Sequence, residues 1–357
     1  MKIKSLLLTL VLSALSNTNP VRINSKTIPK SVAQTISAGT LDGSFGGGVN
    51  GPSAGLVRTD FGNGADIINA MQIQADGKIV VAGESYNGTN NDFALARYNA
   101  DGTPDNTFGD NSSSTNWTRT DFGNDYDYIY AMQIQADGKI VVAGKSSDPN
   151  YDFALARYNA DGIPDNTFGD NSTSTHWTRT DFGNGADVIF AMQIQSDGKI
   201  VVAGVSYNST DDDFALARYN ADGIPDNTFG DNSLSTNWTR TDFGDGIDII
   251  YAMQIQADGK IVVAGVSYNS TDDDFALARY NADGIPDNTF GDNSLSTNWT
   301  RTDFGDGADK IYAIQIQSDG KIVVAGYNYS GTSYDFALAR YLNDINSLTQ
   351  LKSAYGN

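Results

Sequence analysis

Hydrophobic and polar residues follow a pattern that recurs along most of the chain. In one copy, Ile129–Gln135 alternates apolar and polar side chains, and Lys139–Gly144 is a short β-branched run. Such segments, bounded by turn residues, predict strands, and the Asp-Gly pair between them is a strong hairpin signal. The Asp of this hairpin recurs at intervals of 61, 60, 61 and 61 residues: Asp76, Asp137, Asp197, Asp258 and Asp319.

Two further strands complete the repeat. Asp152–Tyr158 is followed by the turn residues Asn-Ala-Asp-Gly, and Trp177–Phe182 mixes Thr with aromatic residues. The first of these segments would also tolerate a helix, but its brevity and the turn after it favour a strand. Four short antiparallel strands repeated in tandem are typical of a β-propeller blade. The sequence therefore predicts an all-β fold, a five-bladed β-propeller with four antiparallel strands per blade.

The frame of the repeats predicts how such a ring would close. The chain begins with a lone fourth strand, Val57–Phe61, and ends with the first three strands of a repeat, Tyr312–Tyr341. Pairing the N-terminal strand with the last three would complete a fifth blade and remove the exposed sheet edges. An open solenoid would need distinct polar caps, which the sequence lacks. We therefore expect a closed propeller over residues 41–342.

The N-terminal residues have the pattern of an export signal. Lys2 and Lys4 precede an apolar run, Leu6–Leu15, with small residues at its end. This pattern is typical of a cleaved signal peptide, and the run is too short to span a bilayer; a buried strand or helix is the alternative. We expect a signal peptide at 1–16, a linker at 17–40 and a C-terminal tail at 343–357. The protein would then be secreted, extracellular or at the cell surface, with the periplasm as a further setting.

The charged residues exclude several classes of function. The formal net charge is −20, with 42 Asp among the 43 acidic residues, one Glu (Glu84), one His (His176) and no Cys. So acidic a chain lacks the clustered Lys and Arg that bind nucleic acid or anionic membranes. The absence of Cys excludes a disulfide framework and thiol catalysis. We expect no nucleic-acid partner, no membrane insertion and a monomer.

The repeat resembles a known family. Ala136–Gly144, Phe153–Gly162 and Asp165–Gly169 are closely similar to the bacterial delta-60 repeat, and five consecutive units between Leu41 and Tyr341 carry the pattern. This resemblance implies a β-propeller of unknown function in a secreted or surface setting. It implies no catalytic residues. The chain departs from the family pattern in a longer polar segment between the third and fourth strands.

Few residues suit a catalytic site. A glycoside hydrolase needs two carboxyl groups, one with a raised pKa, and Glu84 is expected in an exposed loop between the second and third strands. A Ser-His-Asp triad would need His176, whose position holds Asn in other repeats, so drift at an exposed loop explains it better. The segments Gly204–Gly246 and Gly265–Gly307 are identical. Near-identical blades favour repeated binding surfaces over one asymmetric catalytic site.

Two acidic features could hold a cation. The loop Asn99–Asp105 and its copies resemble part of an integrin-type calcium loop, although Arg97 takes the place of the first ligand; a self-capped turn is the alternative. The second feature is an Asp just before the first strand of every repeat. These carboxylates are expected to form a ring near the mouth of the central channel, with solvated turns as the alternative: Asp66, Asp127, Asp187, Asp248 and Asp309. We expect no cofactor, with weak Ca²⁺ binding as the one candidate.

Arg and Trp also recur at fixed positions. The Arg of the third strand, Arg157 in one repeat, is expected to pair with the Asp of the fourth, Asp181, because a buried guanidinium needs an anionic partner. A Trp opens the fourth strand and could either stack on a sugar or peptide or pack between blades: Trp117, Trp177, Trp238 and Trp299.

These features favour a non-catalytic binding or adhesion module that presents repeated loops to a protein or carbohydrate (glycan) ligand. The alternatives are an Asp-based glycoside hydrolase or lyase with its site at the channel mouth, and a purely structural surface protein. One Glu, one His and no Cys leave few of the groups that general acid–base and nucleophilic catalysis use. We therefore expect a protein that is not an enzyme.

Overall fold

The computed structural model describes residues 38–46, 55–62, 64–109, 116–123, 126–147, 150–169, 176–183, 185–230, 237–244, 246–291, 297–305 and 307–343. Within these ranges every regular element is a β-strand, as predicted. The same ranges contain no helix with the length and apolar character that crossing a bilayer requires. The predicted signal peptide, residues 17–37 of the predicted linker and residues 344–357 of the predicted tail lie outside the described residues.

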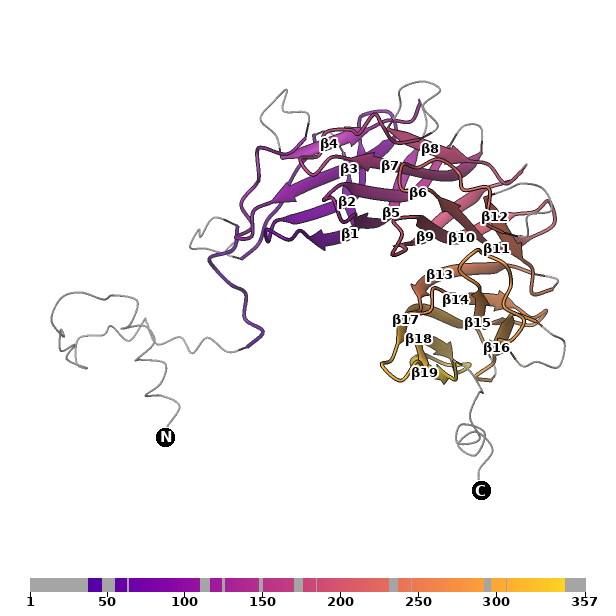
Figure 1. Ribbon diagram of the computed structural model, residues 1–357. Coiled ribbons are helices and arrows are strands. Elements are labelled where there is room, and N and C mark those ends of the chain that lie inside the picture. The colour runs from indigo at the N-terminus through magenta and orange to yellow at the C-terminus, as the bar shows by residue number, and fades with distance from the viewer. Residues whose placement is uncertain are drawn as a thin grey trace, which may run out of the picture. The chain divides into compact units, whose positions relative to one another are not determined.

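The chain divides into two compact units, Met1–Asp42 and Gly43–Asn357, and all strands belong to the second. They form five antiparallel sheets, which we call blades 1 to 5 (Figure 1). Blades 1 to 4 have four strands each, and blade 5 has three. The bounds are β1 (Asp66–Ile73), β2 (Ile79–Tyr86), β3 (Asn91–Tyr98) and β4 (Trp117–Thr120); β5 (Asp127–Ile134), β6 (Ile140–Ser147), β7 (Tyr151–Tyr158) and β8 (Trp177–Thr180); β9 (Asp187–Ile194), β10 (Ile200–Tyr207), β11 (Asp212–Tyr219) and β12 (Trp238–Thr241); β13 (Asp248–Ile255), β14 (Ile261–Tyr268), β15 (Asp273–Tyr280) and β16 (Trp299–Thr302); β17 (Asp309–Ile316), β18 (Ile322–Tyr329) and β19 (Tyr334–Tyr341).

The predicted hairpins are confirmed. Between β5 and β6 the Gln135 amide donates to the Lys139 carbonyl at 2.8 Å, and Gly138 stands at φ 85°. That conformation is open to Gly at no steric cost, which is why the Asp-Gly pair marks the turn. The start of the first strand and the end of the second strand therefore lie together at the end of the blade that is opposite to this turn.

Each first strand contains a β-bulge that sequence periodicity does not reveal. In β5 the register shifts between Ile129 and Ala131, so Tyr130 is the extra residue. A Gly lies opposite the bulge, because a Cβ on Gly144 would stand 1.8 Å from the Tyr128 carbonyl oxygen. Bulges of this kind re-aim a side chain. The same shift recurs in β1, β9, β13 and β17.

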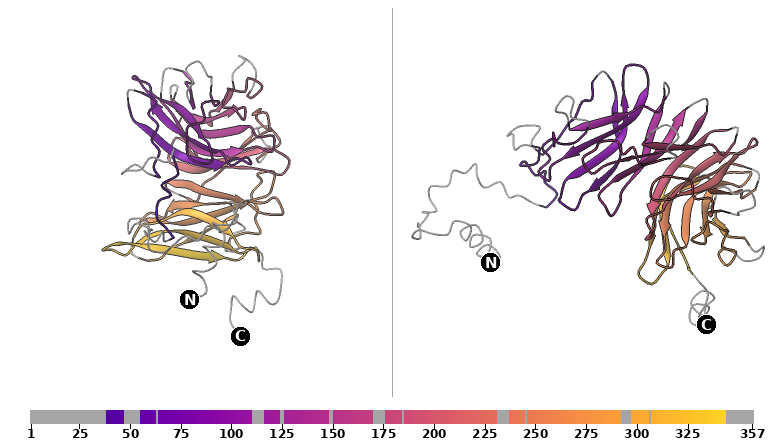
Figure 2. Two further views of the ribbon diagram at one scale, coloured as in Figure 1. Left: turned by 90° about the vertical axis from the view of Figure 1, so that its left-hand side faces the viewer. Right: turned by 45° about the horizontal axis from the view of Figure 1, so that its top comes forward.

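The hydrophobic core lies between successive blades. Phe93 and Leu95 of blade 1 pack against Ile129 and Met132 of blade 2, and all four are buried. The first strands also lie side by side, β1 against β5, β5 against β9, β9 against β13 and β13 against β17 (Figure 1). Figure 2 shows the same series of sheets from two further directions. A glutamine joins them, since the Ile134 amide donates to Gln72 Oε1 at 2.7 Å.

The closing pair predicted from the frame is not formed among the described residues. Blade 5 has three strands, and Val57–Phe61 has no strand structure. This segment packs instead on blade 1, where Val57 and Phe61 contact the cluster of Val81, Ala96 and Tyr98. The five sheets therefore confirm the predicted blades but not the predicted closure of the ring.

Candidate functional site

A buried arginine fixes the end of each third strand. Arg218 donates from Nε to Asp226 Oδ2 at 2.8 Å and from Nη1 to the Ala282 carbonyl of the next repeat at 2.5 Å. The predicted partner, an Asp of the fourth strand, is wrong. A bridge between Tyr219 and Pro225 folds the following turn back beside the strand and brings Asp226 to the Arg. The equivalent pairs lie at 2.7, 2.8 and 2.7 Å: Arg97–Asp105, Arg157–Asp165 and Arg279–Asp287.

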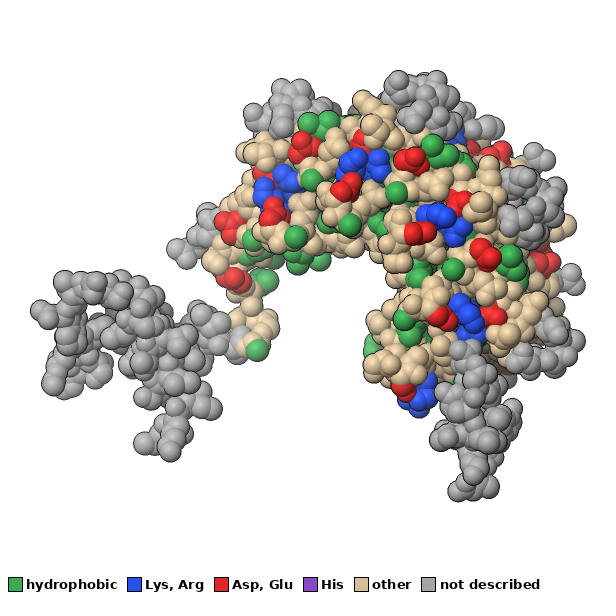
Figure 3. Space-filling model, viewed as in Figure 1, with side chains coloured by type: hydrophobic (Ala, Val, Ile, Leu, Met, Phe, Trp, Pro, Cys, Tyr) green, Lys and Arg blue, Asp and Glu red, His purple; other side chains and the backbone are tan. Residues whose placement is uncertain are grey.

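This ion pair occupies the loop that resembles an integrin-type calcium loop. In the first copy, Asp105 Oδ2 contacts Arg97 Nε and Lys78 Nζ, both at 2.7 Å, while Oδ1 accepts the Thr107 amide at 3.1 Å. Asp101 caps its own turn. Two protein cations thus lie at the carboxylate, and Figure 3 shows such pairings of basic and acidic groups repeated across the visible face. This geometry is that of a self-capped turn, the alternative to a calcium loop. Weak Ca²⁺ binding at the loop stays a prediction.

Three aspartates meet at each junction between neighbouring blades, and we call each set a junction cluster. One stands at the start of a third strand, one follows the fourth strand, and one begins the first strand of the next blade. One oxygen of each lies within 4.8 Å of the others; the first and last members are buried and the middle one is exposed. The clusters are Asp92, Asp121 and Asp127; Asp152, Asp181 and Asp187; Asp213, Asp242 and Asp248; and Asp274, Asp303 and Asp309.

The structure thus places four of the five predicted ring aspartates in these clusters. The fifth, Asp66, is half-buried at blade 1, and its Oδ2 accepts the Phe61 amide at 3.0 Å. Sequence reasoning did not group the two other members of each cluster with these aspartates, because strand topology alone brings the three together. Whether the carboxylates line a channel mouth stays a prediction.

Burial makes the clusters electrostatically unfavourable when they are fully ionised. It raises the pKa of Asp127 and Asp248 to about 7 and that of Asp187 and Asp213 to about 6. Hydrogen bonds such as that from the Phe243 amide to Asp248 Oδ2 at 2.8 Å oppose the shift without cancelling it. At Asp226, burial also acts to raise the pKa, but Thr228, Lys199 and Arg218 outweigh it and lower the pKa to about 2.

These opposite shifts predict how stability depends on pH. A carboxyl whose native pKa is raised stabilises the fold below its unfolded pKa, near 4, and this stability is lost as the pH rises through 6 to 7. The lowered pKa of Asp226 matters only below about pH 4. In the presence of chelator, we expect the thermal midpoint to rise by several degrees when the pH falls from 8 to 5. Calorimetric melts across this range test it, with Asp187→Asn/Asp248→Asn expected to flatten the profile; a wild-type midpoint that falls over this window would contradict it.

The bulges of the first strands form a second repeated feature, which we call the bulge row: Asn69, Tyr130, Phe190, Tyr251 and Tyr312. Ring centroids of neighbouring aromatic members lie 5.4, 5.5 and 5.5 Å apart. Three of these rings are half-buried and that of Tyr312 is exposed. Aromatic faces that keep part of their surface in solvent can stack on sugar rings or peptide side chains. The sequence analysis did not predict this row. A signal was present, because an aromatic residue recurs once in each of four repeats, each time about fourteen residues before a Gly.

Comparison with known proteins defines the repeat. A family model described as a domain of unknown function (DUF5122) beta-propeller matches residues 74–108, 135–168, 195–229, 256–290 and 317–344. Five segments of the chain, one in each blade, are therefore similar to the repeat of this β-propeller family. Each match runs from the hairpin turn to the end of the repeat's third strand or beyond, and the first four include the Arg–Asp pairs. No curated protein matches the chain at a significant level.

The solved structures that match the chain share little sequence with it. A protein of unknown function from Dyadobacter fermentans is 12% identical, over 76% of this chain and 74% of its own, with a TM-score of 0.40. A putative glycosidase from Bacteroides thetaiotaomicron is 12% identical over 78% and 87%, with a TM-score of 0.30. The periplasmic gluconolactonase of Pseudomonas aeruginosa is 12% identical over 78% and 72%, with a TM-score of 0.35. At these low scores no function is transferred.

The tryptophans of the propeller repeats lie between blades. The half-buried Trp177 ring is 5.0 Å from the Phe122 ring of the preceding blade, and Trp238 is 5.0 Å from Phe182. These contacts agree with the packing alternative. Stacking of the exposed part of each ring on a ligand stays a prediction.

The two residues considered for catalysis were both expected in exposed loops, and this placement is wrong. Glu84 is buried in β2, where strand pairing continues beyond the Gly of the repeat, and it accepts Asn69 Nδ2 at 2.6 Å. His176 is half-buried at the junction of blades 1 and 2, with Nε2 3.2 Å from Thr120 Oγ1. Burial lowers the pKa of His176 to about 4.

Proposed function

We propose that the protein is a non-catalytic binding module, secreted or at the cell surface, whose five blades close into one ring and present repeated groups to a protein or glycan. The bulge row carries this proposal, because it offers partly exposed aromatic rings from four neighbouring blades. The signal-like N-terminus supports export. The near-identity of the blades supports repeated binding over a single asymmetric reaction centre.

The two ends of the blade series support closure because each exposes the residues that the internal junctions bury. On blade 1, Ile68 is 61% and Met71 is 62% exposed, whereas the equivalent Ile129 is fully buried. On blade 5, Phe336 is 99% and Leu338 is 65% exposed. Large apolar side chains exposed together on one sheet mark a surface that is covered in the working protein. We infer that the exposed faces of blade 1 and blade 5 cover each other.

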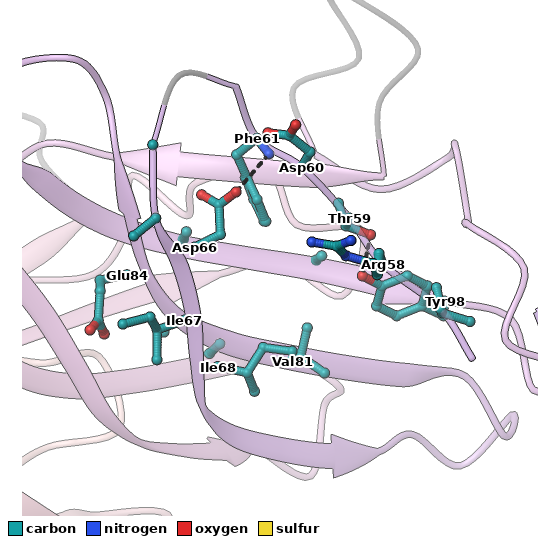
Figure 4. A pocket seen from close by; sticks show the side chains of 17 residues that line it. Arg58, Thr59, Asp60, Phe61, Asp66, Ile67, Ile68, Val81, Glu84 and Tyr98 are labelled. Carbon is teal, nitrogen blue, oxygen red and sulfur yellow. Dashed lines mark hydrogen bonds between the residues drawn. The ribbon is translucent and has the colours of Figure 1, made fainter. Parts of the chain in front are cut away.

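A hollow of about 760 Å³ marks the face of blade 1 that blade 5 would cover (Figure 4). Ile67, Ile68 and Val81 lie together along it. At the next junction the residue equivalent to Val81, Val142, packs in the core that Phe93 and Leu95 of the preceding blade share. Phe336 and Leu338 are their counterparts on blade 5.

The N-terminal segment already has the contacts of a fourth strand. The Phe61 amide donates to Asp66 at 3.0 Å, as Phe122 does to Asp127 at 2.9 Å. Thr59 Oγ1 lies 2.5 Å from the Tyr98 hydroxyl, and the equivalent pair at the next junction stands at 2.6 Å. Val57–Phe61 is therefore held in place for pairing with β19, in the register by which β3 pairs with β4.

A second candidate, an Asp-based glycoside hydrolase or lyase, is favoured by one observation. Each junction cluster sets a buried carboxyl of raised pKa, such as Asp248, beside an exposed carboxyl, Asp242. A carboxyl group of raised pKa beside a second carboxyl group is the pairing that glycoside hydrolysis uses. Such a site would have to recur at four junctions.

One experiment separates the two candidates. The full chain is screened on glycan and peptide arrays beside a panel of glycoside hydrolase and polysaccharide lyase substrates. We expect binding without turnover, weakened on the order of tenfold or more by Tyr251→Ala, because truncating an aromatic anchor typically costs 2 kcal/mol or more. Tyr207→Ala, a partly exposed tyrosine outside the bulge row, is the matched control and should bind as wild type.

Turnover of any substrate that Asp121→Asn/Asp181→Asn/Asp242→Asn/Asp303→Asn abolishes would replace this proposal by the enzymatic one. Binding that Tyr251→Ala and Tyr207→Ala weaken equally would remove the bulge row as the surface. Circular dichroism and the thermal midpoint of each variant show that the blades remain folded.

A further inference from the structure

We propose that each junction cluster binds a divalent cation, Ca²⁺ in preference to Mg²⁺, through its three carboxylates. The third cluster, Asp213, Asp242 and Asp248, shows the arrangement best. Its members come from two blades, so a bound ion would join neighbouring blades. This inference goes beyond the proposed function and stands whether or not the protein binds a glycan.

Buried oxygens without a protein donor point to a ligand. Asp213 and Asp248 are each 1% exposed, and Oδ1 of each has no protein hydrogen-bond partner. Their other oxygens are bound, since Asn208 Nδ2 donates to Asp213 Oδ2 at 2.6 Å and the Phe243 amide donates to Asp248 Oδ2. Asp187 Oδ1 and Asp274 Oδ1 in the neighbouring clusters are likewise buried and lack a protein donor. A buried carboxylate oxygen left in this state is costly.

The local charge also calls for a dication. Three carboxylates face one guanidinium, with Arg240 Nε 3.6 Å from Asp213 Oδ2. When all three carboxylates are ionised, the three aspartates and Arg240 together carry a net charge of −2. The exposed middle carboxylate, Asp242, leaves one side of the cluster open to solvent, through which a hydrated ion can enter.

The make-up of the cluster favours the larger ion. Ca²⁺ binds oxygen at 2.3–2.6 Å, so two ligands on opposite sides of it stand at most about 5 Å apart. The cluster oxygens lie within 4.8 Å of one another. Mg²⁺ demands near-ideal octahedral geometry at 2.0–2.1 Å and gives up its bound waters reluctantly, so a site that offers three carboxylates from separate strand ends suits Ca²⁺ better.

The fourth cluster provides an internal comparison. Blades 1 to 4 place a Ser beside the last Asp of the set, and blade 5 places Asn328 there. Asn328 Nδ2 donates to Asp309 Oδ1 at 2.8 Å, and so engages the atom that stays without a protein donor in Asp248. We expect this fourth cluster to bind the ion more weakly than the third.

A fifth site rests on the proposed ring closure. Pairing β19 with the N-terminal segment would bring Asp335 to Asp60 and Asp66, which hold the corresponding positions in the repeat. Asp66 Oδ1 is another buried oxygen without a protein donor. If Ca²⁺ binds at the four junction clusters but not at this fifth site, the result would argue against closure of the ring and leave the other four sites unaffected.

The test is calcium titration of the chelator-treated full chain by isothermal calorimetry, with thermal melts in Ca²⁺, Mg²⁺ and chelator. The decisive variant neutralises the four exposed cluster members, Asp121→Asn/Asp181→Asn/Asp242→Asn/Asp303→Asn. The matched control makes the same change in net charge at four exposed hairpin turns, Asp137→Asn/Asp197→Asn/Asp258→Asn/Asp319→Asn.

We expect the wild type and the control variant to bind Ca²⁺ and to gain thermal stability from it, with at least tenfold weaker binding of Mg²⁺. The cluster variant should fold, as judged by circular dichroism, and bind Ca²⁺ at least tenfold more weakly at the four formed clusters, so that at most the fifth site keeps its affinity. Wild-type protein that shows neither binding heat nor a shifted midpoint at millimolar Ca²⁺ would overturn the proposal. Equal losses in the two variants would overturn it as well, because they would reflect net charge alone.

Discussion

Phe336→Ala is expected to lower the free energy of unfolding by about 3–5 kcal/mol, the usual effect of removing a buried phenylalanine. The Phe336 side chain is 99% exposed on blade 5. Truncating so exposed a residue ordinarily changes the free energy of unfolding by about 0.5 kcal/mol or less. The large effect follows only if the ring closes and Phe336 enters the hollow on blade 1. Denaturant unfolding at equilibrium measures the difference.

Two variants bracket this result. Phe153→Ala truncates the equivalent phenylalanine of blade 2, which is fully buried between blades, and sets the full effect of the truncation. Thr332→Ala lies in the exposed turn between β18 and β19 and should leave stability unchanged. If Phe336→Ala unfolds like Thr332→Ala while Phe153→Ala loses its several kcal/mol, the last blade is uncovered and closure is wrong.

Arg218→Met should be nearly as damaging, for a different reason. The guanidinium is buried, pairs with Asp226 at 2.8 Å, and stacks 4.8 Å from the centroid of the Phe229 ring. Removing it leaves the Asp226 carboxylate buried with Lys199 as its remaining cation. Breaking one partner of a buried pair typically costs about 3–5 kcal/mol, and the bond to the next repeat is lost as well. Thermal and denaturant unfolding should both show the loss.

The matched control is Arg340→Met, which alters the equivalent arginine of the last blade. Arg340 has Leu348 at the position that Asp226 holds after Arg218, so its removal leaves no partner carboxylate unpaired and should cost less than about 1 kcal/mol. Replacing both members of the buried pair, Arg218→Met/Asp226→Leu, should recover part of the loss, because the unpaired charge is gone. Equal effects of Arg218→Met and Arg340→Met would show that the buried pair contributes little to stability.

Much of the fold could be predicted because strand formation here is local. Alternation, β-branched runs and Asp-Gly turns predicted Asp152–Tyr158 as a strand, and β7 runs from Tyr151 to Tyr158. The bulge at Tyr130 could not be seen in this way, since one extra residue leaves the alternation of the flanking segments intact. Its position depends on the close approach of the Tyr128 carbonyl to Gly144, a contact between strands.

The candidate sites are formed by contacts between strands and turns, and the sequence pattern does not show which residues make these contacts. The Arg218 partner was predicted in the wrong strand because the choice between two nearby aspartates is made by how the turn folds back. The Asp before each first strand was recognised as a cation candidate. Its companions, such as Asp213 and Asp242 at Asp248, join it only because the strand ends of two blades converge.

Closure is tested most directly by a cysteine pair, because the chain has no Cys of its own. The pairing of Ala94 with Arg119 across β3 and β4 has its counterpart in Ala337 and Arg58, whose Cβ atoms would stand about 4.5–5.5 Å apart in a closed ring. Arg58→Cys/Ala337→Cys is oxidised beside Ala94→Cys/Arg119→Cys as the positive control, then analysed on non-reducing gels and by peptide mass spectrometry. The closed ring predicts a disulfide within one molecule, at a yield similar to the control. A control that cross-links while the test pair stays reduced, or bonds only between molecules, would contradict it.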